Sequence, residues 1–294
     1  MNQTAPWKSL YPFESHELRL DGLRYHYLDE GSGSPLLMVH GNPTWSFYWR
    51  NLAQAFRDTH RVIAPDHMGC GLSDKPQKYN YTLEQHIQNL LQLVEQLDLR
   101  NITLLVHDWG GAIGLGSALR VSDRFSRFVV FNTGAFPPPY VPFRIRVCRI
   151  PLLGTVAMRG FNVFARAALT MATEKPERFT AAVKAGLIAP YNNWNNRVAI
   201  DNFVRDIPLS PSHPTWDTLT DIEAGLPTLA DKPIKLVWGM KDWCFTPVCL
   251  EKFANIWPNA EVHRIEDAGH YVIEDAMEEV IGIVETFLSS DRQG

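Results

Sequence analysis

The stretch that decides the fold of this chain is Leu104-Leu105-Val106-His107-Asp108-Trp109-Gly110-Gly111-Ala112. It begins as an apolar run, passes through two glycines and continues in small residues, which predicts a buried strand, a sharp turn and a helix. Such a turn lifts its central side chain out of the sheet, and here that side chain is Asp108, where a serine is more usual. Taken alone, such a segment is more often an ordinary turn, in which Asp108 is solvated and helps to cap the following helix.

Outward from this stretch, strands and helices alternate along the chain. An antiparallel pair of strands is predicted over 18–29, because apolar residues alternate on either side of an Asp-Gly turn. Short apolar runs predict further strands over 36–40, 61–65, 102–106, 127–131, 234–238 and 262–265. Helices are predicted over 49–56, 81–97 and 276–288. This order predicts an α/β fold, with a mostly parallel sheet covered by helices on both faces.

The alternation stops after Asn132, where three consecutive prolines break the chain and a helix-rich stretch follows. Two of its helices are predicted over 160–171 and 176–188. We therefore predict an inserted helical cap at 133–227, between a first core segment at 1–132 and a second at 228–294. Because ligands of open α/β sheets bind at the carboxyl ends of the strands, the cap is expected to cover a ligand site.

Composition excludes several classes of function. The 294 residues are 45% hydrophobic and 20% charged, as in a soluble globular protein with a large core. A net charge of -4, without runs of like charge, argues against nucleic-acid partners. No stretch approaches the roughly 18 apolar residues of a membrane span, so no transmembrane segment is expected. Positions 1–11 do not resemble a secretory signal, so a cytoplasmic location is expected.

Cysteines and acidic residues outside the central stretch predict no further site. The four cysteines lack the spacing of a metal site, and we expect no metal and no organic cofactor. The acidic residues scattered on the terminal helix are expected to form a solvated face, and they are Glu274, Asp275, Glu278 and Glu279.

A carboxylate at position 108 narrows the chemistry. It displaces a leaving group from a saturated carbon and forms an alkyl ester, which activated water then hydrolyses. His270, in a small-residue loop after the last strand, is the candidate base for that water. Asp242 follows the preceding strand and is the candidate acid that orients His270. Nucleophile, acid and histidine then follow one another in the chain order of α/β-hydrolases.

Two other positions bear on the choice of the orienting acid. In related architectures the acid follows the strand that here ends near Phe131, but this chain has Asn132 there, without a carboxylate. Asp267 is the runner-up, although its closeness to His270 in sequence favours a role within the loop. Asp242 remains the better candidate.

Two neutral donors complete the predicted site. His40-Gly41-Asn42-Pro43 follows an apolar strand, and its glycine lets the backbone expose amide groups to an anion. The backbone amides of Asn42 and Trp109 are candidates for an oxyanion hole. Their side chains add an amide and an indole N–H, which suit an anionic leaving group such as halide without pairing with Asp108 as a lysine or arginine would.

These motifs resemble the haloalkane dehalogenase family. The similar segments are 40–44, 65–76, 106–111 and 269–270, and the resemblance spans the core from about Tyr25 to Phe287. With the acid at Asp242 and none at Asn132, the chain looks like the third dehalogenase subfamily. The resemblance implies an α/β-hydrolase fold, attack by Asp108 on the carbon of a haloalkane, halide held by Asn42 and Trp109, and ester hydrolysis by water that His270 activates.

Other segments, at 131–137, 161–166 and 189–194, also resemble the β-lactone decarboxylases of long-chain olefin biosynthesis. That resemblance implies attack by Asp108 on the lactone ring, followed by loss of carbon dioxide and formation of an alkene. We place haloalkane hydrolysis first and lactone decarboxylation second. The expected substrate is accordingly a small apolar haloalkane or β-lactone, with halide as the expected product ion of the first reaction.

Two weaker alternatives stay open. Epoxide hydrolases share the aspartate nucleophile but need phenolic donors from the cap, for which Tyr140 and Tyr191 are the candidates. A small-molecule receptor without turnover is the alternative outside enzymes, and the complete set of nucleophile, acid and base argues against it. Homo-oligomer formation is left open.

Overall fold

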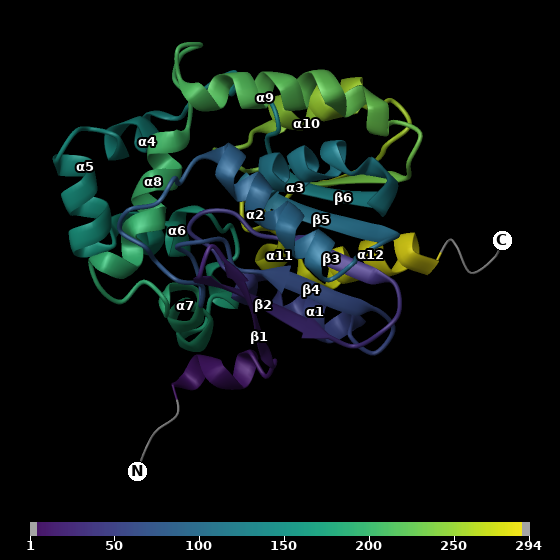
Figure 1. Ribbon diagram of the computed structural model, residues 1–294, viewed down its shortest axis with the longest axis horizontal. Coiled ribbons are helices and arrows are strands. Elements are labelled where there is room, and N and C mark those ends of the chain that lie inside the picture. Colours follow the sequence, from purple (N-terminus) through teal and green to yellow (C-terminus); the bar gives the residue numbers. More distant parts are fainter. Residues whose placement is uncertain (1–4, 290–294) are drawn as a thin grey trace.

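The computed structural model describes residues 5–289, and its centre is one eight-stranded sheet (Figure 1). Positions 1–4 and 290–294 of the two predicted core segments lie outside the described residues. The strands, in chain order, are β1 (Ser15–Leu20), β2 (Leu23–Glu30), β3 (Pro35–Val39), β4 (Arg61–Pro65), β5 (Ile102–Asp108), β6 (Phe125–Thr133), β7 (Ile234–Gly239) and β8 (Glu261–Ile265). Each strand predicted from the sequence is present.

The strand order across the sheet is β1-β2-β4-β3-β5-β6-β7-β8. β2 pairs antiparallel with β1 and β4, and the remaining pairs are parallel. Successive strand side chains point to opposite faces, so β5 sends Leu104 and Val106 into one apolar core and Leu105 into the other. The predicted α/β fold with a mostly parallel sheet is confirmed.

Helices cover both faces of this sheet, as Figure 1 shows. One apolar core includes side chains of α2 (Leu83–Gln96), α3 (Trp109–Arg120), α9 (Pro214–Gly225) and α10 (Pro247–Ile256). The other includes side chains of α1 (Arg50–Phe56), α11 (Val272–Asp275) and α12 (Met277–Ser289). α2 begins at Leu83, two residues after the predicted bound, because Thr82 caps the helix by accepting a hydrogen bond from the Gln85 amide at 3.4 Å.

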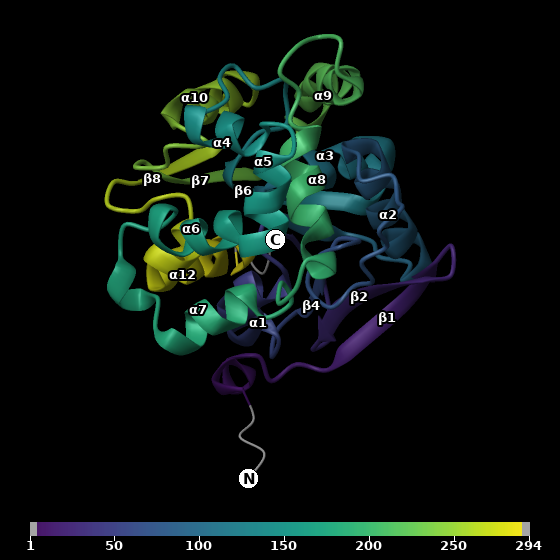
Figure 2. The same ribbon diagram turned by 90° about the vertical axis from the view of Figure 1, so that its left-hand side faces the viewer.

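Between β6 and β7 the chain is helical, on the side of the molecule that faces the viewer in Figure 2. Its α-helices are α4 (Phe143–Cys148), α5 (Leu153–Thr155), α6 (Val163–Met171), α7 (Ala181–Ile188) and α8 (Val198–Asp206), followed by α9. Shorter helical turns lie at η4 (Val156–Gly160), η5 (Pro176–Arg178), η6 (Asn195–Arg197) and η7 (Leu226–Leu229). The division into core segments and a cap at 133–227 stays a prediction.

Two helices predicted in this segment are wrong in their bounds. The helix expected over 160–171 starts only at Val163, because Asn162 adopts a left-handed backbone with φ of +56°. The helix expected over 176–188 is a short turn followed by α7. There Thr180 has extended backbone and caps α7 by accepting a hydrogen bond from the Val183 amide at 3.3 Å.

The expectation of a solvated acidic face is wrong for two of its four residues. Glu274 is buried and receives two hydrogen bonds from the Arg50 guanidinium, at 2.5 and 2.8 Å. Asp275 is buried too, and accepts hydrogen bonds from several backbone amides. Both lie on the short helix α11, where the chain turns inward before α12, so a solvent-facing pattern does not extend back to them.

The first helical turn, η1 (Pro6–Leu10), and the turns η2 (Ser46–Trp49) and η3 (Ser122–Arg124) complete the elements. Over residues 5–289, no helix combines the length and the apolar character needed to cross a bilayer.

Candidate active site

Asp108 ends β5 and immediately precedes α3, at the sharp turn predicted from the sequence. Its φ of +53° lies in the left-handed region, which is unfavourable for a residue with a side chain and directs the carboxylate away from the sheet. Gly41 packs so closely against this carboxylate that a Cβ at Gly41 would overlap Asp108. The close approach explains why a glycine precedes Asn42.

The Asp108 carboxylate is buried and held from the backbone. The Asn42 amide donates to Oδ1 at 2.6 Å, and the Thr133 hydroxyl donates to the Asp108 carbonyl. Burial raises the pKa of Asp108, and this effect is only partly offset by the nearby His270 charge and by the amides of Trp109 and Asn42. Asp108 is thus placed and oriented, but its charge is only partly compensated.

His270 and Asp242 lie beside Asp108 in the order that the sequence predicts. The loop after β8 carries His270, whose Nδ1 lies 2.8 Å from Oδ2 of Asp242, in the loop after β7. The other ring nitrogen, Nε2, faces the Asp108 carboxylate at 3.6 Å, beyond hydrogen-bond distance. The structure therefore brings together all three residues proposed as nucleophile, base and acid.

The charge of His270 is governed by its two carboxylate neighbours. Burial lowers the pKa of His270, but the Asp242 carboxylate, which is also its hydrogen-bond partner, and Asp108 outweigh burial and raise it overall. A protonated imidazole here stabilises the ionised form of Asp108. Loss of the Asp108 charge, as in an ester, would lower the pKa of His270 and favour the neutral imidazole, which is the form able to accept a proton.

Asn132 orients the acid, a role that sequence reasoning missed. Its side-chain amide donates to Oδ2 of Asp242 at 3.0 Å and to the Gly239 carbonyl at 3.0 Å, while its oxygen accepts from the Gly239 amide at 2.8 Å. The amides of Cys244 and Phe245 donate to the other oxygen of Asp242. The sequence contains a signal for this role, because Asn132 occupies the strand end where related architectures have the acid. An amide at that strand end is able to bond an acid on the neighbouring strand end.

Asp275 supports the histidine loop and was also missed. It accepts hydrogen bonds from the amides of Gly269 and Glu174, at 2.8 and 2.9 Å, and from the Thr173 hydroxyl. It thereby joins the loop that carries His270 to the helical segment between β6 and β7. No sequence pattern shows this link, because Thr173 and Asp275 are far apart in the chain.

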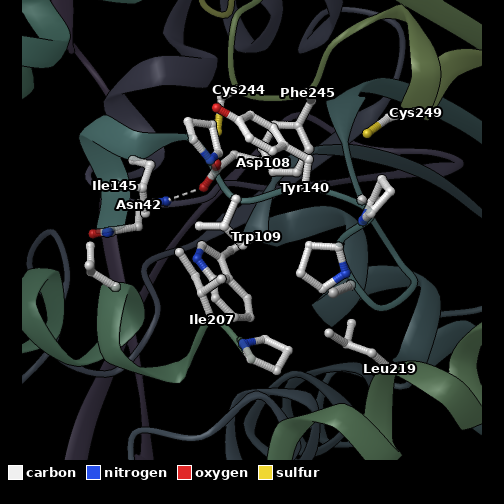
Figure 3. Close-up of a pocket in the computed structure, with 18 of the residues that line it drawn as sticks. Asn42, Asp108, Trp109, Tyr140, Ile145, Ile207, Leu219, Cys244, Phe245 and Cys249 are labelled. Carbon is white, nitrogen blue, oxygen red and sulfur yellow. Dashed lines mark hydrogen bonds between the residues drawn. The ribbon is translucent and has the colours of Figure 1, made fainter. Parts of the chain in front are cut away.

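The two predicted side-chain donors line the same cavity as Asp108, and Figure 3 shows Asn42 and Trp109 close to it. The Asn42 side-chain amide makes a single long hydrogen bond, to the Ile200 carbonyl at 3.4 Å, and its buried oxygen has no partner among the described residues. The Trp109 indole N–H has no hydrogen-bond partner within residues 5–289, and its ring packs on Phe203. Both side chains retain capacity to donate to a ligand anion.

The cavity above Asp108 has two apolar lobes that share Asn42, Asp108, Ile145, Phe164 and Cys244. The first lobe, of about 110 Å³, extends towards α8, α9 and α10, and is lined further by Trp109, Phe136, Tyr140, Ile207, Leu219 and Cys249. The second, of about 370 Å³, extends towards α4 and α6, and is lined further by Phe143, Val147, Val163, Ala168, Met171 and Trp243. The site therefore has apolar space in two directions from Asp108.

The weaker candidates are engaged elsewhere. Asp267 is largely exposed and pairs with Lys175 at 2.7 Å, so it does not reach His270. The Tyr191 hydroxyl is buried and donates to the Thr44 carbonyl at 3.0 Å, and Tyr191 lines neither lobe. Tyr140 alone of the two phenols lines the cavity, which weakens the epoxide hydrolase alternative.

Comparisons with known proteins identify the family of this chain. The sequence model of the family described as "alpha/beta hydrolase fold" matches residues 34–276. A cis-3-alkyl-4-alkyloxetan-2-one decarboxylase from Shewanella oneidensis is 45% identical, over 96% of this chain and 90% of that protein. Haloalkane dehalogenase 2 from Mycobacterium tuberculosis is 33% identical, over 96% of this chain and 98% of that protein.

A solved structure gives the same picture. The crystal structure of the haloalkane dehalogenase DatA from Agrobacterium tumefaciens superposes with a TM-score of 0.85 at 26% sequence identity, and covers 94% of this chain and 96% of that one. The chain belongs to the alpha/beta hydrolase fold family, within the group that contains cis-3-alkyl-4-alkyloxetan-2-one decarboxylases and haloalkane dehalogenases.

Proposed function

We propose that this protein decarboxylates a cis-3,4-dialkyl β-lactone, with Asp108 as the nucleophile, to give a cis-alkene and carbon dioxide. The observation that carries the proposal is the pair of apolar lobes that meet at Asp108. A lactone with alkyl groups on neighbouring ring carbons needs two apolar channels from one reacting centre. An unbranched terminal haloalkane needs only one. The 45% identical relative, whose name states such a lactone, supports the same substrate class.

The proposed reaction balances without water. An oxygen of Asp108 attacks ring carbon 4 and breaks its bond to the ring oxygen, which leaves a free carboxylate on carbon 3. The bond from carbon 3 to that carboxylate then breaks, and its electrons form the double bond to carbon 4. The ester bond from carbon 4 to Asp108 breaks in the same step, which releases carbon dioxide and the alkene and restores the Asp108 carboxylate.

The stereochemistry follows from this geometry. Attack on carbon 4 opposite the ring oxygen leaves the Asp108 ester antiperiplanar to the new carboxylate. Elimination from that arrangement keeps the two alkyl groups on one side, so a cis-lactone gives a cis-alkene.

Other residues around Asp108 have separate roles in the proposal. The Asn42 side chain and the Trp109 indole donate to the carboxylate that leaves the ring, where negative charge develops. His270, held by Asp242, keeps Asp108 ionised through its own charge. The Asn42 amide and the Trp109 indole are neutral, so they do not form an ion pair with Asp108.

Hydrolysis of haloalkanes, which we expected first from the sequence, is the second candidate. The unpaired donors of Asn42 and Trp109 favour it, because they suit a halide as well as a carboxylate. In that reaction Asp108 displaces halide from a saturated carbon, and water activated by His270 hydrolyses the ester. The lactone is now placed first because of the second lobe and the 45% identical relative.

The test compares both substrates on the wild type and two variants. Asp108→Asn is expected to lower turnover of a long-chain cis-β-lactone by about 10⁴-fold or more, because the nucleophile is lost. With His270→Ala, a bromoalkane should give one equivalent of halide and a stable ester on Asp108. The lactone should still give several equivalents of alkene, because its reaction needs no water.

The measurements are alkene and carbon dioxide by gas chromatography, halide by titration, and the mass of the protein. Arg264→Gln, a change in an exposed ion pair, is the control and should match the wild type. An inert lactone combined with rapid halide release would reject the decarboxylase in favour of the dehalogenase. Full lactone turnover by Asp108→Asn would reject Asp108 as nucleophile.

A further inference from the structure

Large apolar side chains that face solvent are concentrated in one short part of the described chain. Ten of the thirteen lie between positions 140 and 171: Tyr140, Phe143, Val147, Ile150, Leu152, Leu153, Val156, Phe161, Val163 and Met171. They belong to α4, α5, η4, α6 and their connections, which lie together in Figure 2. A patch of this kind on a soluble fold marks an interaction surface.

Leu152 shows that this exposure is not a by-product of packing. It is 81% exposed, and its φ of +61° lies in the region that leucine rarely adopts. The energetic cost of this backbone conformation is therefore not offset by burial of the Leu152 side chain. A strained, exposed apolar residue of this kind points to a role outside the folded chain.

The same segment is basic without any acidic residue. No aspartate or glutamate occurs from position 124 to 173, whereas five arginines lie between 144 and 166. Arg144, Arg146 and Arg166 are exposed and form no ion pair within residues 5–289. Arg144 stacks on Trp243 at 5.3 Å. Since the whole chain has a net charge of -4, this segment is opposite in charge to the rest of the molecule.

The larger lobe of the cavity opens into this surface. Its inner end is lined by the buried residues Asp108 and His270, and its outer end by the exposed side chains of Phe143, Val147 and Val163. A ligand that enters the lobe from this side therefore meets apolar side chains before it reaches Asp108.

We propose that the face formed by α4, α5, η4 and α6, here called the apolar basic face, docks onto the surface of an anionic lipid bilayer. Exposed apolar side chains would enter the boundary between headgroups and acyl chains, while Arg144, Arg146 and Arg166 meet the anionic headgroups. This is attachment to one leaflet, since no helix over residues 5–289 is able to span. Charge complementarity favours the bilayer over a second copy, which would bring like charges together.

Docking places the outer end of the larger lobe at the acyl chains. A dialkyl lactone and the alkene made from it both partition into lipid, so they would pass between bilayer and Asp108 without crossing water. This consequence rests on the proposed function, whereas the docking itself rests only on the exposed residues and charges.

The test measures cosedimentation of the full-length protein with vesicles. Vesicles that contain phosphatidylglycerol are compared with vesicles of phosphatidylcholine alone, at low and high salt. One variant, Arg146→Gln with Arg166→Gln, removes charge, and a second, Leu152→Ser with Leu153→Ser and Phe161→Ser, removes apolar surface. None of these residues lines either lobe. Two control variants make the same kinds of change elsewhere: Arg19→Gln with Arg100→Gln, and Leu209→Ser with Val248→Ser.

The wild type should bind phosphatidylglycerol vesicles, and high salt should weaken binding. The charge variant should bind about thirtyfold more weakly, since each arginine near an anionic surface contributes about 1 kcal/mol. The apolar variant should lose at least about tenfold. Both controls should bind like the wild type. Circular dichroism should show all variants folded, because the altered side chains are exposed.

The proposal is overturned if the wild type does not sediment with phosphatidylglycerol vesicles, or if the controls lose as much binding as the two variants. It is also overturned if the apolar variant changes an oligomer into a monomer while the wild type ignores vesicles, because the face then joins two copies. The test measures vesicle binding and not catalysis. If the wild type binds vesicles but does not turn over a lactone, the proposed function is rejected and the docking proposal stands.

Discussion

In the proposed reaction, the buried carboxylate of Asp108 must be ionised to attack. Burial raises its pKa above the ordinary value of 3.8, and His270 and the amides of Trp109 and Asn42 offset this only in part. A group with a raised pKa loses its charge at a higher pH as acid is added. The proposed nucleophile therefore loses its charge as pH falls through a value above 3.8.

We expect the acid limb of kcat/KM for a lactone to lie above pH 3.8, measured as a pH–rate profile of alkene formation. Circular dichroism at each pH separates protonation of Asp108 from acid unfolding. Asn89→Ala, at a buried asparagine that bonds Tyr79 away from the site, serves as control and should leave the limb unmoved. An acid limb at or below 3.8 in folded protein would contradict the assignment.

At the scale of elements, α11 and the loop before it depend on Asp275. Its carboxylate accepts from the amides of Gly269 and Glu174 and from the Thr173 hydroxyl. Removing a buried charged acceptor leaves these donors without partners, at roughly 1–3 kcal/mol for each buried group left unsatisfied. Asp275→Ala is expected to lower the free energy of unfolding by about 3 kcal/mol, measured by urea unfolding.

Glu278→Ala is the matched control, because Glu278 is on the neighbouring helix and pairs with Arg178 at the surface. Exposed ion pairs contribute about 0–1 kcal/mol, so this variant should differ little from the wild type. Equal losses in the two variants would show that the burial of Asp275 has no special importance.

At the scale of the whole molecule, the prediction concerns how the two lobes divide a branched substrate. Ala168, on α6, lines the larger lobe, and Ile207, directly after α8, lines the smaller one, so Ala168→Phe and Ile207→Phe each fill part of one lobe. Each variant is expected to lower kcat/KM for a lactone with two long arms by about tenfold or more, because an overpacked site costs about 1–3 kcal/mol.

In each variant, kcat/KM for short bromoalkanes should stay within about twofold of the wild-type value, since a short chain needs one lobe only. The measurement is kcat/KM for lactones in which one arm at a time is shortened. Shortening the arm in the filled lobe should restore the rate. If neither variant distinguishes the two arms, the substrate does not occupy both lobes.

Much of the fold followed from local patterns, because they report local physics. Apolar runs and helical spacing predicted all eight strands and α1, α2 and α12, since alternation and period depend on neighbours within a few residues. The helices over 160–171 and 176–188 were misplaced because the backbone of Asn162 and the cap at Thr180 interrupt a favourable composition. The sequence likewise indicated Asp108, Asp242 and His270, because parallel strands bring their carboxyl ends to one edge of the sheet.

By itself, then, the sequence determined the α/β architecture, the position of the turn at Asp108 and the order of the three candidate catalytic residues. Only the tertiary structure decided that Asn132 holds Asp242, that Asp275 is buried beneath the histidine loop, and that the cavity divides into two lobes. The physical reason is range. Hydrogen bonds across more than a hundred residues, and the volume left between helices, depend on how distant side chains pack.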